Sequence, residues 1–267
     1  MRLTSWNLLH GLAIPPDEKI DKVALLASEI ALLASDVIGL QEVDLNLERS
    51  GSRNQVADVA ASLGARYWAF APSVMGSPDE KWRKPEDSDA RVASDAAKTF
   101  APGYGIGLVS KIPVISWHRL ELKASPIGMP MTWPVDGKMK RFYVRDHPRS
   151  ALGAVLENGW LVINTHLSFV PFFNFFQLMK IKKWANKLPI TDKKKIVIMG
   201  DLNIPFGVFV KGINWNSLVK QKTFPSVMPK VQIDYFLSQK VASEDVLHIP
   251  SIHRGMSDHL SLTVDLD

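Results

Sequence analysis

The 267-residue chain has 46% hydrophobic and 22% charged residues, which supports a sizeable core and one domain over residues 1–267. It contains no cysteine, which excludes disulfides, thiolate metal sites and a cysteine nucleophile. The formal net charge of +5 weakly favours a phosphate-rich partner. No apolar run has the length of a signal peptide or a membrane span, so we expect a cytoplasmic protein without stable membrane insertion. No sequence feature indicates an obligate protein partner.

The first hundred residues alternate between strand and helix patterns. We predict strands over 2–9, 36–43 and 66–72, and helices over 17–34 and 55–63. Asp17 can cap the first helix, and Gly64 ends the second. The polar stretch 73–103 is too long for an ordinary connection and predicts a mobile flap or a functional loop.

The rest of the chain mixes hairpins with helices. Residues 151–167 form two apolar runs joined across Asn158-Gly159, which predicts a hairpin with a type I′ turn. Residues 123–138 are expected to be irregular. We also predict helices over 172–188 and near Trp215, and strands over 104–110, 114–122, 141–146, 196–200, 231–238, 245–250 and 259–266. Hairpins interleaved with helices favour a mixed-sheet α/β sandwich over a purely parallel sheet.

Polar side chains stand at the ends of the predicted strands. Each one alone has a structural explanation as a turn or cap residue. Asp234 differs, because its neighbours Ile233 and Tyr235 are apolar and a buried carboxylate needs a partner such as a histidine. The other residues in this pattern are Asn7, Glu42, His166, Asp201, Asn203, Asp258 and His259.

Together these side chains suit the hydrolysis of a phosphate ester, which needs a hard cation, a carboxylate to orient or activate water, and donors for developing charge. Glu42 and Asn7 offer the oxygen ligands that Mg²⁺ prefers. His166 and His259 can donate to phosphate oxygens, and a carboxylate neighbour is expected to hold each in its charged form. Asp234 is one candidate for that neighbour. No spacing favours zinc.

Six segments, WNLLHG, GLQEVD, NTHL, GDLN, IDYFL and SDH, occur in this order from residue 6 to residue 259. They resemble the signature blocks of the endonuclease/exonuclease/phosphatase superfamily, which has the DNase I-like fold. The resemblance implies an α/β fold, a four-layer αββα sandwich of two mixed β-sheets flanked by helices, with the site at the sheet ends. It also implies a Mg²⁺-dependent hydrolase, in which Mn²⁺ can substitute.

The resemblance further implies a role for each polar residue. Asn7 and Glu42 would hold the metal ion, and Asp258 with His259 would complete the metal and phosphate site. Asp201 would orient or deprotonate the attacking water. The remaining roles are phosphate binding by Asn203, stabilisation of the pentavalent transition state by His166, and orientation of a catalytic histidine by Asp234.

Three further residues are weaker candidates for substrate binding. Arg149 is either a bidentate phosphate ligand or a surface arginine. Asn164 lies two residues before His166 and points to the same face of the strand. Tyr104 lies near a position where the family often has a polar or aromatic residue, and it can equally be a packing residue.

The substrate class stays open at this point. The leading interpretation is a phosphodiesterase acting on nucleic acid, as an endonuclease or exonuclease. Lysines between Lys180 and Lys195 can track a nucleic-acid backbone, or simply form a solvated face, and Trp82 with Arg83 and Lys84 can stack on bases. The block QEVD resembles the DNase, phosphatase and sphingomyelinase-like branches more than apurinic-site endonucleases.

An alternative is a phosphatase or phosphodiesterase acting on a lipid, such as sphingomyelin, or on a small phosphorylated molecule. Five phenylalanines between residues 169 and 176 would suit a lipid-binding wedge. Packing of these aromatics onto the sheet is the interpretation that we favour. A non-catalytic binding module is the third alternative, and it is disfavoured because every expected metal and acid–base position is occupied.

Overall fold

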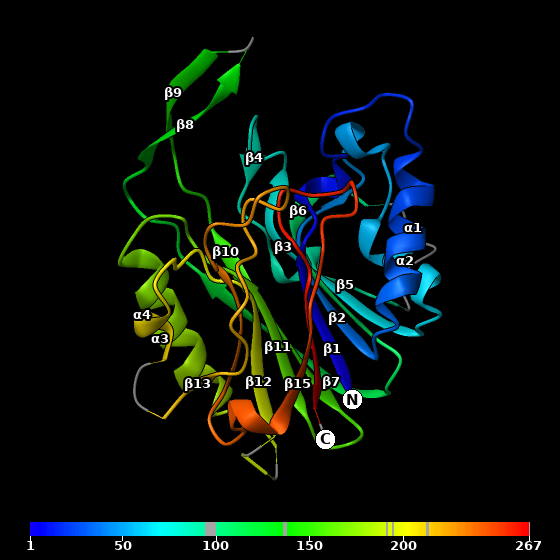
Figure 1. The fold of residues 1–267 in the computed structure, drawn as a ribbon, viewed down its shortest axis with the longest axis vertical. Helices are drawn as coiled ribbons and strands as arrows, with labels where there is room; N and C mark the ends of the chain where they lie inside the picture. The colour runs from blue at the N-terminus through cyan, green and yellow to red at the C-terminus, as the bar shows by residue number, and fades with distance from the viewer. Residues whose placement is uncertain (94–99, 136–137, 191, 194, 212–213, 267) are drawn as a thin grey trace.

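The computed structural model describes residues 1–93, 100–135, 138–190, 192–193, 195–211 and 214–266. Two mixed β-sheets pack face to face, and helices cover both outer faces (Figure 1). The expected four-layer αββα sandwich is therefore confirmed. Among the described residues, no helix is both long and apolar enough to cross a bilayer.

The first sheet has eight strands within the described part of the chain, in the order β15-β16-β1-β2-β6-β3-β4, and β5 also pairs with β3. β1 and β2 are parallel neighbours, whereas β16 and β6 run antiparallel to them. The strands are β1 (Arg2–Asn7), β2 (Val37–Leu45), β3 (Tyr67–Gly76), β4 (Trp82–Arg83), β5 (Arg91–Val92), β6 (Gly103–Ser110), β15 (Val246–Ile249) and β16 (Leu262–Leu266).

The second sheet has six strands in the same described ranges, in the order β13-β14-β12-β11-β10-β7. Its central strands β11 and β12 are parallel, and both neighbours are antiparallel to them. The strands are β7 (Val114–Leu122), β10 (Arg149–Leu156), β11 (Leu161–His166), β12 (Ile196–Asp201), β13 (Asn216–Ser217) and β14 (Asp234–Ser238).

Helices bury one apolar face against each sheet. α1 (Lys22–Leu33) and α2 (Gln55–Leu63) share an apolar cluster with the first sheet, and α3 (Phe173–Ala185) and α4 (Gly207–Lys211) share one with the second. The short 3₁₀ helices are η1 (Leu9–Gly11), η2 (Glu48–Ser50), η3 (Asp87–Asp89) and η5 (Ser243–Asp245). α2 begins and ends at the predicted residues. α1 begins later than predicted, because Asp21 accepts from the Val23 and Ala24 amides while Asp17 accepts from Lys19 in a separate turn.

The core between the sheets combines aliphatic side chains from both. Leu3 and Leu108 of the first sheet and Val162 and Met199 of the second belong to one buried cluster. Burying each such side chain contributes about 1.5–3 kcal/mol. At Gly39 a Cβ atom would lie 2.9 Å from Cγ of Asn164, whose side chain is held by hydrogen bonds to both Leu40 and Gly107, so glycine lets the sheets approach here.

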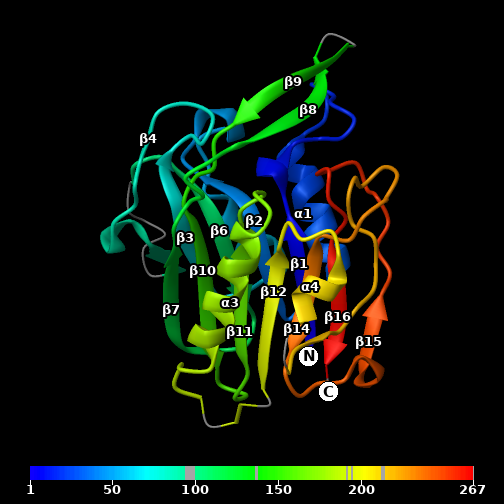
Figure 2. The same ribbon diagram turned by 90° about the vertical axis from the view of Figure 1, so that its left-hand side faces the viewer.

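The connection predicted to be irregular over 123–138 is instead largely a β-ribbon. β8 (Met129–Val135) pairs with β9 (Lys138–Val144) and extends beyond the end of the sandwich (Figure 2). Pro130 and Pro134 made a strand improbable, because proline cannot donate to a ladder. Both strands of an isolated ribbon are edges, however, and an edge strand tolerates proline.

Two other loop predictions need correction. The stretch 73–103 is not one long loop where the structure describes it, since it extends β3 and adds β4 and β5; residues 94–99 lie outside the described residues. The hairpin at Asn158-Gly159 is confirmed, but only Gly159 has positive φ, so the turn is not type I′. Its hydrogen bonds from Gly159 to Leu156 and from Leu156 to Trp160 fit a three-residue connection. The helix expected near Trp215 ends before that residue, as α4.

Candidate active site

The predicted polar residues gather at one end of the sandwich because of the strand directions. β1 and β2 are parallel and bring Asn7 and Glu42 to the same edge of the first sheet. In the second sheet, His166 pairs in register with Asp201, and Asp201 with Asp234. The polar ends of both sheets therefore meet.

The backbone is irregular at this edge. Pairing of β2 with β6 shifts between Leu40 and Val43, which forms a bulge around Glu42. Glu42, Asn203 and Ser257 all have positive φ, at 53°, 51° and 62°. Left-handed conformations are costly for residues other than glycine and concentrate at functional sites. The bulge turns Glu42 out of the regular strand alternation.

One amide links two carboxylates at the centre of the site. Asn7 Nδ2 donates to Glu42 Oε1 at 3.0 Å and to Asp201 Oδ2 at 3.0 Å, while Asn7 Oδ1 accepts from the Leu9 amide at 3.1 Å. Asp201 Oδ1 accepts from the Asn203 amide at 2.9 Å. Oxygen atoms from both sheets are thus fixed next to one another.

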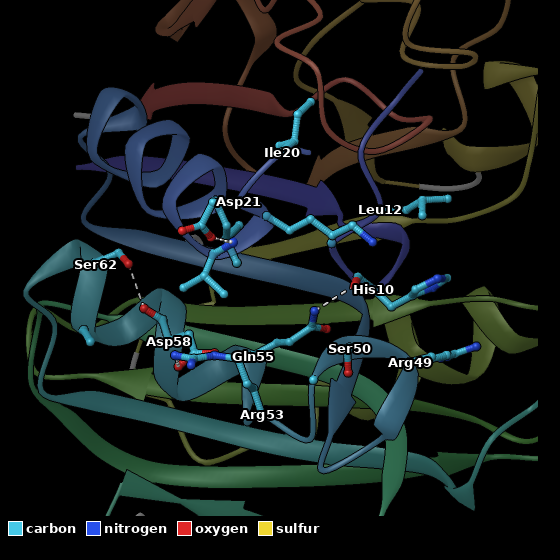
Figure 3. A pocket seen from close by; sticks show the side chains of 16 residues that line it. His10, Leu12, Ile20, Asp21, Arg49, Ser50, Arg53, Gln55, Asp58 and Ser62 are labelled. Carbon is cyan, nitrogen blue, oxygen red and sulfur yellow. Dashed lines mark hydrogen bonds and ion pairs between the residues drawn. The ribbon is translucent and has the colours of Figure 1, made fainter. Parts of the chain in front are cut away.

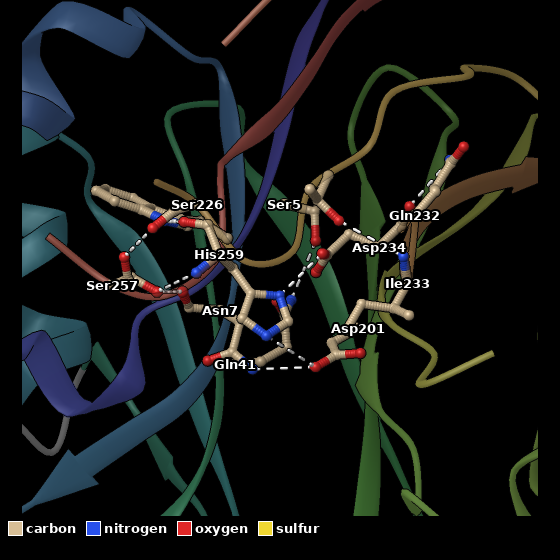
Figure 4. A network of polar contacts seen from close by, with 12 residues as sticks. Ser5, Asn7, Gln41, Asp201, Ser226, Gln232, Ile233, Asp234, Ser257 and His259 are labelled. Atoms are coloured by element: carbon tan, nitrogen blue, oxygen red, sulfur yellow. Dashed lines mark hydrogen bonds and ion pairs between the residues drawn. The ribbon is translucent and has the colours of Figure 1, made fainter. Parts of the chain in front are cut away.

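The partner that the sequence required for Asp234 is His259. The Nδ1–H group of His259 donates to Asp234 Oδ2 at 2.9 Å, and His259 Nε2 lies 3.8 Å from Asp201 Oδ2 (Figure 4). Burial lowers the pKa of His259, but the charges of Asp234 and Asp201 and the hydrogen bond outweigh it and raise this pKa to about 10. His259 is therefore a buried cation that points its Nε2 toward Asp201.

His166 has the opposite character. Its Nε2 accepts from Arg149 Nη1 at 3.1 Å, and Asn203 Nδ2 lies 3.2 Å from the same atom. Burial and the charge of Arg149 hold the pKa of His166 well below its ordinary value. An arginine can only donate, so His166 is neutral and accepts at Nε2. The expectation of a charged His166 beside a dedicated carboxylate was wrong, because its nearest charged contact is a cation.

Arg149 is almost fully buried, so the surface-arginine interpretation is also wrong. Its Nη2 atom lies 3.4 Å from Asp146 Oδ1, and its Nε atom has no hydrogen-bond partner among the described residues. Asp146 was not identified from the sequence, although it stands in the same DHPR segment. Its Oδ2 accepts from the Ser168 hydroxyl and the Ser125 amide. Asp146 therefore holds Arg149 against His166.

Burial disfavours the charged forms of the remaining carboxylates. Burial raises the pKa of Glu42 and of Asp258, and it raises the pKa of Asp201 to about 7 although the His259 cation opposes this. Oδ1 of Asp258 and Oδ1 of Asp234 are buried without a hydrogen-bond partner in the described structure. A nearby divalent cation would offset these charges, and carboxylate and amide oxygens suit Mg²⁺.

Among the described residues, ligand atoms lie close enough for a metal ion in two groups, Glu42 with His166 and Asp201, and Asp201 with Asp234 and His259. Asp201 belongs to both groups. Asp258 belongs to neither, and it acts on Glu42 through its charge. The hydrogen bonds of Asn7 thus join Glu42 to Asp201, and Asp258 lies near enough to Glu42 for its charge to raise the pKa of Glu42.

Two weaker candidates lie beside or beneath the site. Asn164 is fully buried, donates to the carbonyls of Leu40 and Gly107, and accepts from Gln41. Its polar atoms connect the two sheets, so the structure does not place it where substrate would bind. Tyr104 packs edge-on against the ring of His147, and burial raises its pKa well above the ordinary value. The geometry favours the packing role for Tyr104.

A separate cavity of about 500 Å³ lies next to α1 and α2 (Figure 3). Its arginines are already paired, Arg49 with Asp44 and Asp79, and Arg53 with Asp58. The buried polar atoms without a hydrogen-bond partner in the described structure include Arg149 Nε, Asp234 Oδ1 and Asp258 Oδ1, and none of these atoms belongs to a residue that lines this cavity. The candidate chemistry is therefore at the sheet ends and not in this cavity.

Comparison with known proteins identifies the family. A sequence profile of the Endonuclease/Exonuclease/phosphatase family matches residues 4–259. The chain belongs to this family. Members of the family are hydrolases of phosphate esters that use divalent metals. No curated protein sequence matches the chain.

Solved structures show the same fold at low sequence identity. An endonuclease/exonuclease/phosphatase protein from Beutenbergia cavernae aligns with a TM-score of 0.60 and 19% identity, over 100% of this chain and 71% of that chain. TDP2 from D. rerio, in complex with a single-strand DNA product, aligns with a TM-score of 0.52 and 14% identity, over 99% of this chain and 97% of that chain. A mutant beta toxin from Staphylococcus aureus with bound magnesium ions aligns with a TM-score of 0.52 and 14% identity, over 100% of this chain and 99% of that chain.

Proposed function

We propose that this protein is a divalent-metal-dependent phosphodiesterase whose active site is the cluster around Asp201. The observation that carries the proposal is the contact of Asn7 with both Glu42 and Asp201, directly beside a charged and a neutral histidine. Glu42 would hold the ion with Asp258 close by, and Asn7 would join through its Oδ1 atom, which here accepts from the Leu9 amide. A bound Mg²⁺ ion would neutralise phosphate charge and lower the pKa of a bound water.

Asp201 is the proposed acceptor for the proton of the attacking water. It is a buried carboxylate whose pKa of about 7 suits a base at neutral pH. Its Oδ2 atom lies 3.8 Å from His259 Nε2. Asp234 keeps His259 charged, so the His259 Nε2–H group can donate to a phosphate oxygen without first acquiring a proton.

Donors for the developing charge come from the second sheet. Arg149 Nη1 and Asn203 Nδ2 both lie within hydrogen-bond distance of His166 Nε2, so two donor groups point toward the same region. A phosphate oxygen entering beside His166 Nε2 would be met by a guanidinium and an amide, as preorganised charge stabilisation requires. In this proposal His166 holds those two donors in position.

The residues of the site indicate which type of bond is cleaved, but they do not specify the chemical groups on either side of that bond. Nucleic acid is one candidate substrate, supported by the net charge of +5 and by the shared fold of TDP2 with its bound DNA product. Some side chains expected to contact nucleic acid are less available for it. Lys182 is buried, Arg83 pairs with Asp89, and Lys84 pairs with Glu121. A lipid phosphodiester is the second candidate, favoured by the exposed aromatic surface described below.

Hydrolysis of bis(4-nitrophenyl) phosphate tests the reaction without assuming a substrate class. We expect activity in Mg²⁺ that EDTA abolishes and added Mg²⁺ restores. Asp201→Ala is expected to remove it, whereas Asp245→Ala, which changes an exposed aspartate, is expected to retain it. Activity that survives both EDTA and Asp201→Ala would refute the proposal. Nicking of supercoiled plasmid under the same conditions then tests nucleic acid as substrate.

A further inference from the structure

The first two turns of helix α3 have an inverted distribution of polar and apolar side chains, whereas Leu178, Ile181 and Ala185 further along bury a regular apolar face. Phe172 at its N-cap and Phe176 in its first turns are 77% and 65% exposed, whereas Asn174 and Gln177 are buried. Asn174 donates to the Asn203 carbonyl, and Gln177 bonds the Ser168 amide and the Lys123 carbonyl. The expectation that these aromatics pack on the sheet was wrong for Phe172 and Phe176, because polar side chains occupy the inner face.

Neighbouring residues extend this exposed apolar surface. Met179 is exposed and follows Phe176 on the same helical face. Phe206 and Phe209, at the start of α4, are 65% and 57% exposed. The hydrogen bonds Asn174 to Asn203 and Lys182 Nζ to the Val210 carbonyl hold the segment from Asn203 through α4 along α3. We call Phe172, Phe176, Met179, Phe206 and Phe209 the aromatic face.

Phe172 has a backbone conformation that glycine would adopt more readily, with φ of 68°. A bulky residue at positive φ is a genuine outlier, and such strain is typical of functional positions. Exposing a large apolar side chain also brings no burial energy to the folded monomer. Phe172 is therefore unfavourable for the isolated chain on two counts, which indicates a function outside the folding core.

Charge in the chain segment that carries the aromatic face is strongly one-sided. Residues 167–233 contain eleven lysines and two acidic residues, Asp192 and Asp201. Lys180, Lys183 and Lys187 are exposed and follow the aromatic part of α3. Exposed aromatics followed by lysines on one helix are the composition of a surface that lies at the interface of an anionic membrane.

The aromatic face adjoins the active site. Phe172 lies six residues after His166, and Phe206 three residues after Asn203, whose amide contacts His166. We propose that the aromatic face docks this protein on an anionic lipid bilayer and thereby presents its active site to phosphodiesters at the headgroup level. The lipid substrate in this statement rests on the proposed function, whereas the docking does not.

A bilayer explains the arrangement better than nucleic acid does. Strand-binding surfaces place cations beside each stacking ring, because the backbone carries one phosphate per base. Here the phenylalanines at 172, 173, 175 and 176 have no cation among them, and the lysines come only from Lys180 onward. Rings that enter the acyl boundary and lysines at the headgroups match this separation.

Co-sedimentation with vesicles tests the docking on the full-length Asp201→Asn variant, which cannot consume the lipid. We expect binding to phosphatidylcholine vesicles that contain phosphatidylserine and much weaker binding to phosphatidylcholine alone. Phe172→Gly and Phe176→Ser in this background are each expected to lower the partition coefficient about tenfold, as loss of one buried ring implies. Phe172→Gly is expected to leave the Tm unchanged or higher, because glycine tolerates positive φ.

Leu32→Ser is the matched control, since Leu32 is an exposed apolar residue on α1 over the other sheet. It is expected to bind vesicles like its parent. Equal binding by all variants would overturn the proposal. The proposal would also be overturned if the two phenylalanine variants kept vesicle binding but lost single-stranded DNA binding or dimerisation. Because binding is measured without turnover, its failure is distinguishable from a failure of the hydrolysis assay.

Discussion

Asn7 Nδ2 lies 3.0 Å from Asp201 Oδ2, although 194 positions separate the two residues in the chain. The contact crosses from β1 of the first sheet to β12 of the second. Because the same nitrogen also donates to Glu42, a single amide keeps two carboxylates together at the sheet ends. This side chain is therefore one of the contacts that fix the relative position of the two sheets at the site, together with Asn164 beneath it.

Asn7→Ala should destabilise the protein in EDTA and, because a proposed metal ligand is lost, more so in Mg²⁺. Removing the amide leaves two buried carboxylates without their shared donor, which costs about 1–3 kcal/mol of unfolding free energy. Urea unfolding in EDTA and in Mg²⁺ measures this, and we expect the stabilisation by Mg²⁺ to be smaller in the variant. Asn186→Ala, at the exposed C-cap of α3, serves as the control. Identical curves for the two variants would contradict the role of Asn7.

Asp234→Asn should lower both the pKa of His259 and the rate of hydrolysis. The carboxylate is the strongest influence that raises this pKa to about 10 against the effect of burial. A neutral asparagine removes the charge but preserves the shape, so we expect a rate loss of about 10²–10⁴ with the fold retained. NMR titration of the His259 ring in metal-free protein checks the cause. A wild-type His259 that titrates at its ordinary value would show that the ion pair has been misjudged.

Arg149→Lys should reduce kcat/KM by about 10–100-fold while preserving the charge. Lysine lacks the planar fork with which Arg149 reaches both His166 and Asp146. Arg145→Lys is the matched control, because Arg145 is exposed four residues earlier. Steady-state kinetics on the diester substrate provides the comparison. Equal kcat/KM for the two variants would mean that charge alone suffices at position 149.

His147→Gln should flatten the loss of stability at acid pH. Burial, assisted by the charge of Arg149, lowers the pKa of His147 from 6.5 to about 3. In the unfolded chain His147 therefore binds a proton below pH 6.5, whereas in the folded protein it stays neutral down to about pH 3. Stability is lost as the pH falls through this window, by at most about 1.4 kcal/mol per pH unit from this group. Unfolding free energies between pH 7 and pH 4 test this, and an unchanged slope in the variant would disprove it.

Local patterns were sufficient for the regular elements. In α2, Val56, Val59, Ala60 and Leu63 recur at helical spacing between Asn54, which caps the helix, and Gly64, which ends it. In β12, an unbroken apolar run predicts a strand that is buried on both faces, with Asp201 at its end. Both features depend on neighbours within a few positions, so the sequence alone predicts them.

Local patterns failed where a distant contact decides the outcome. Residues 123–138 were expected to be irregular, yet 129–135 pairs with β9, and its prolines are tolerated because the ribbon has only edge strands. The phenylalanines of α3 suggested packing on the sheet, yet Asn174 and Gln177 take the inner face because Asn203 and Ser168 offer them hydrogen bonds. Neither partner can be identified from spacing in the helix.

The sequence by itself determined the fold class, the family blocks and which polar residues end the strands. Only the tertiary structure decided that Asn7 bridges Glu42 and Asp201, that His259 is charged through Asp234, and that His166 is neutral beside Arg149. Strand periodicity reports which side of a strand a residue occupies. Protonation depends on burial and on the charges that strand order brings within a few ångströms, and those charges come from remote parts of the chain.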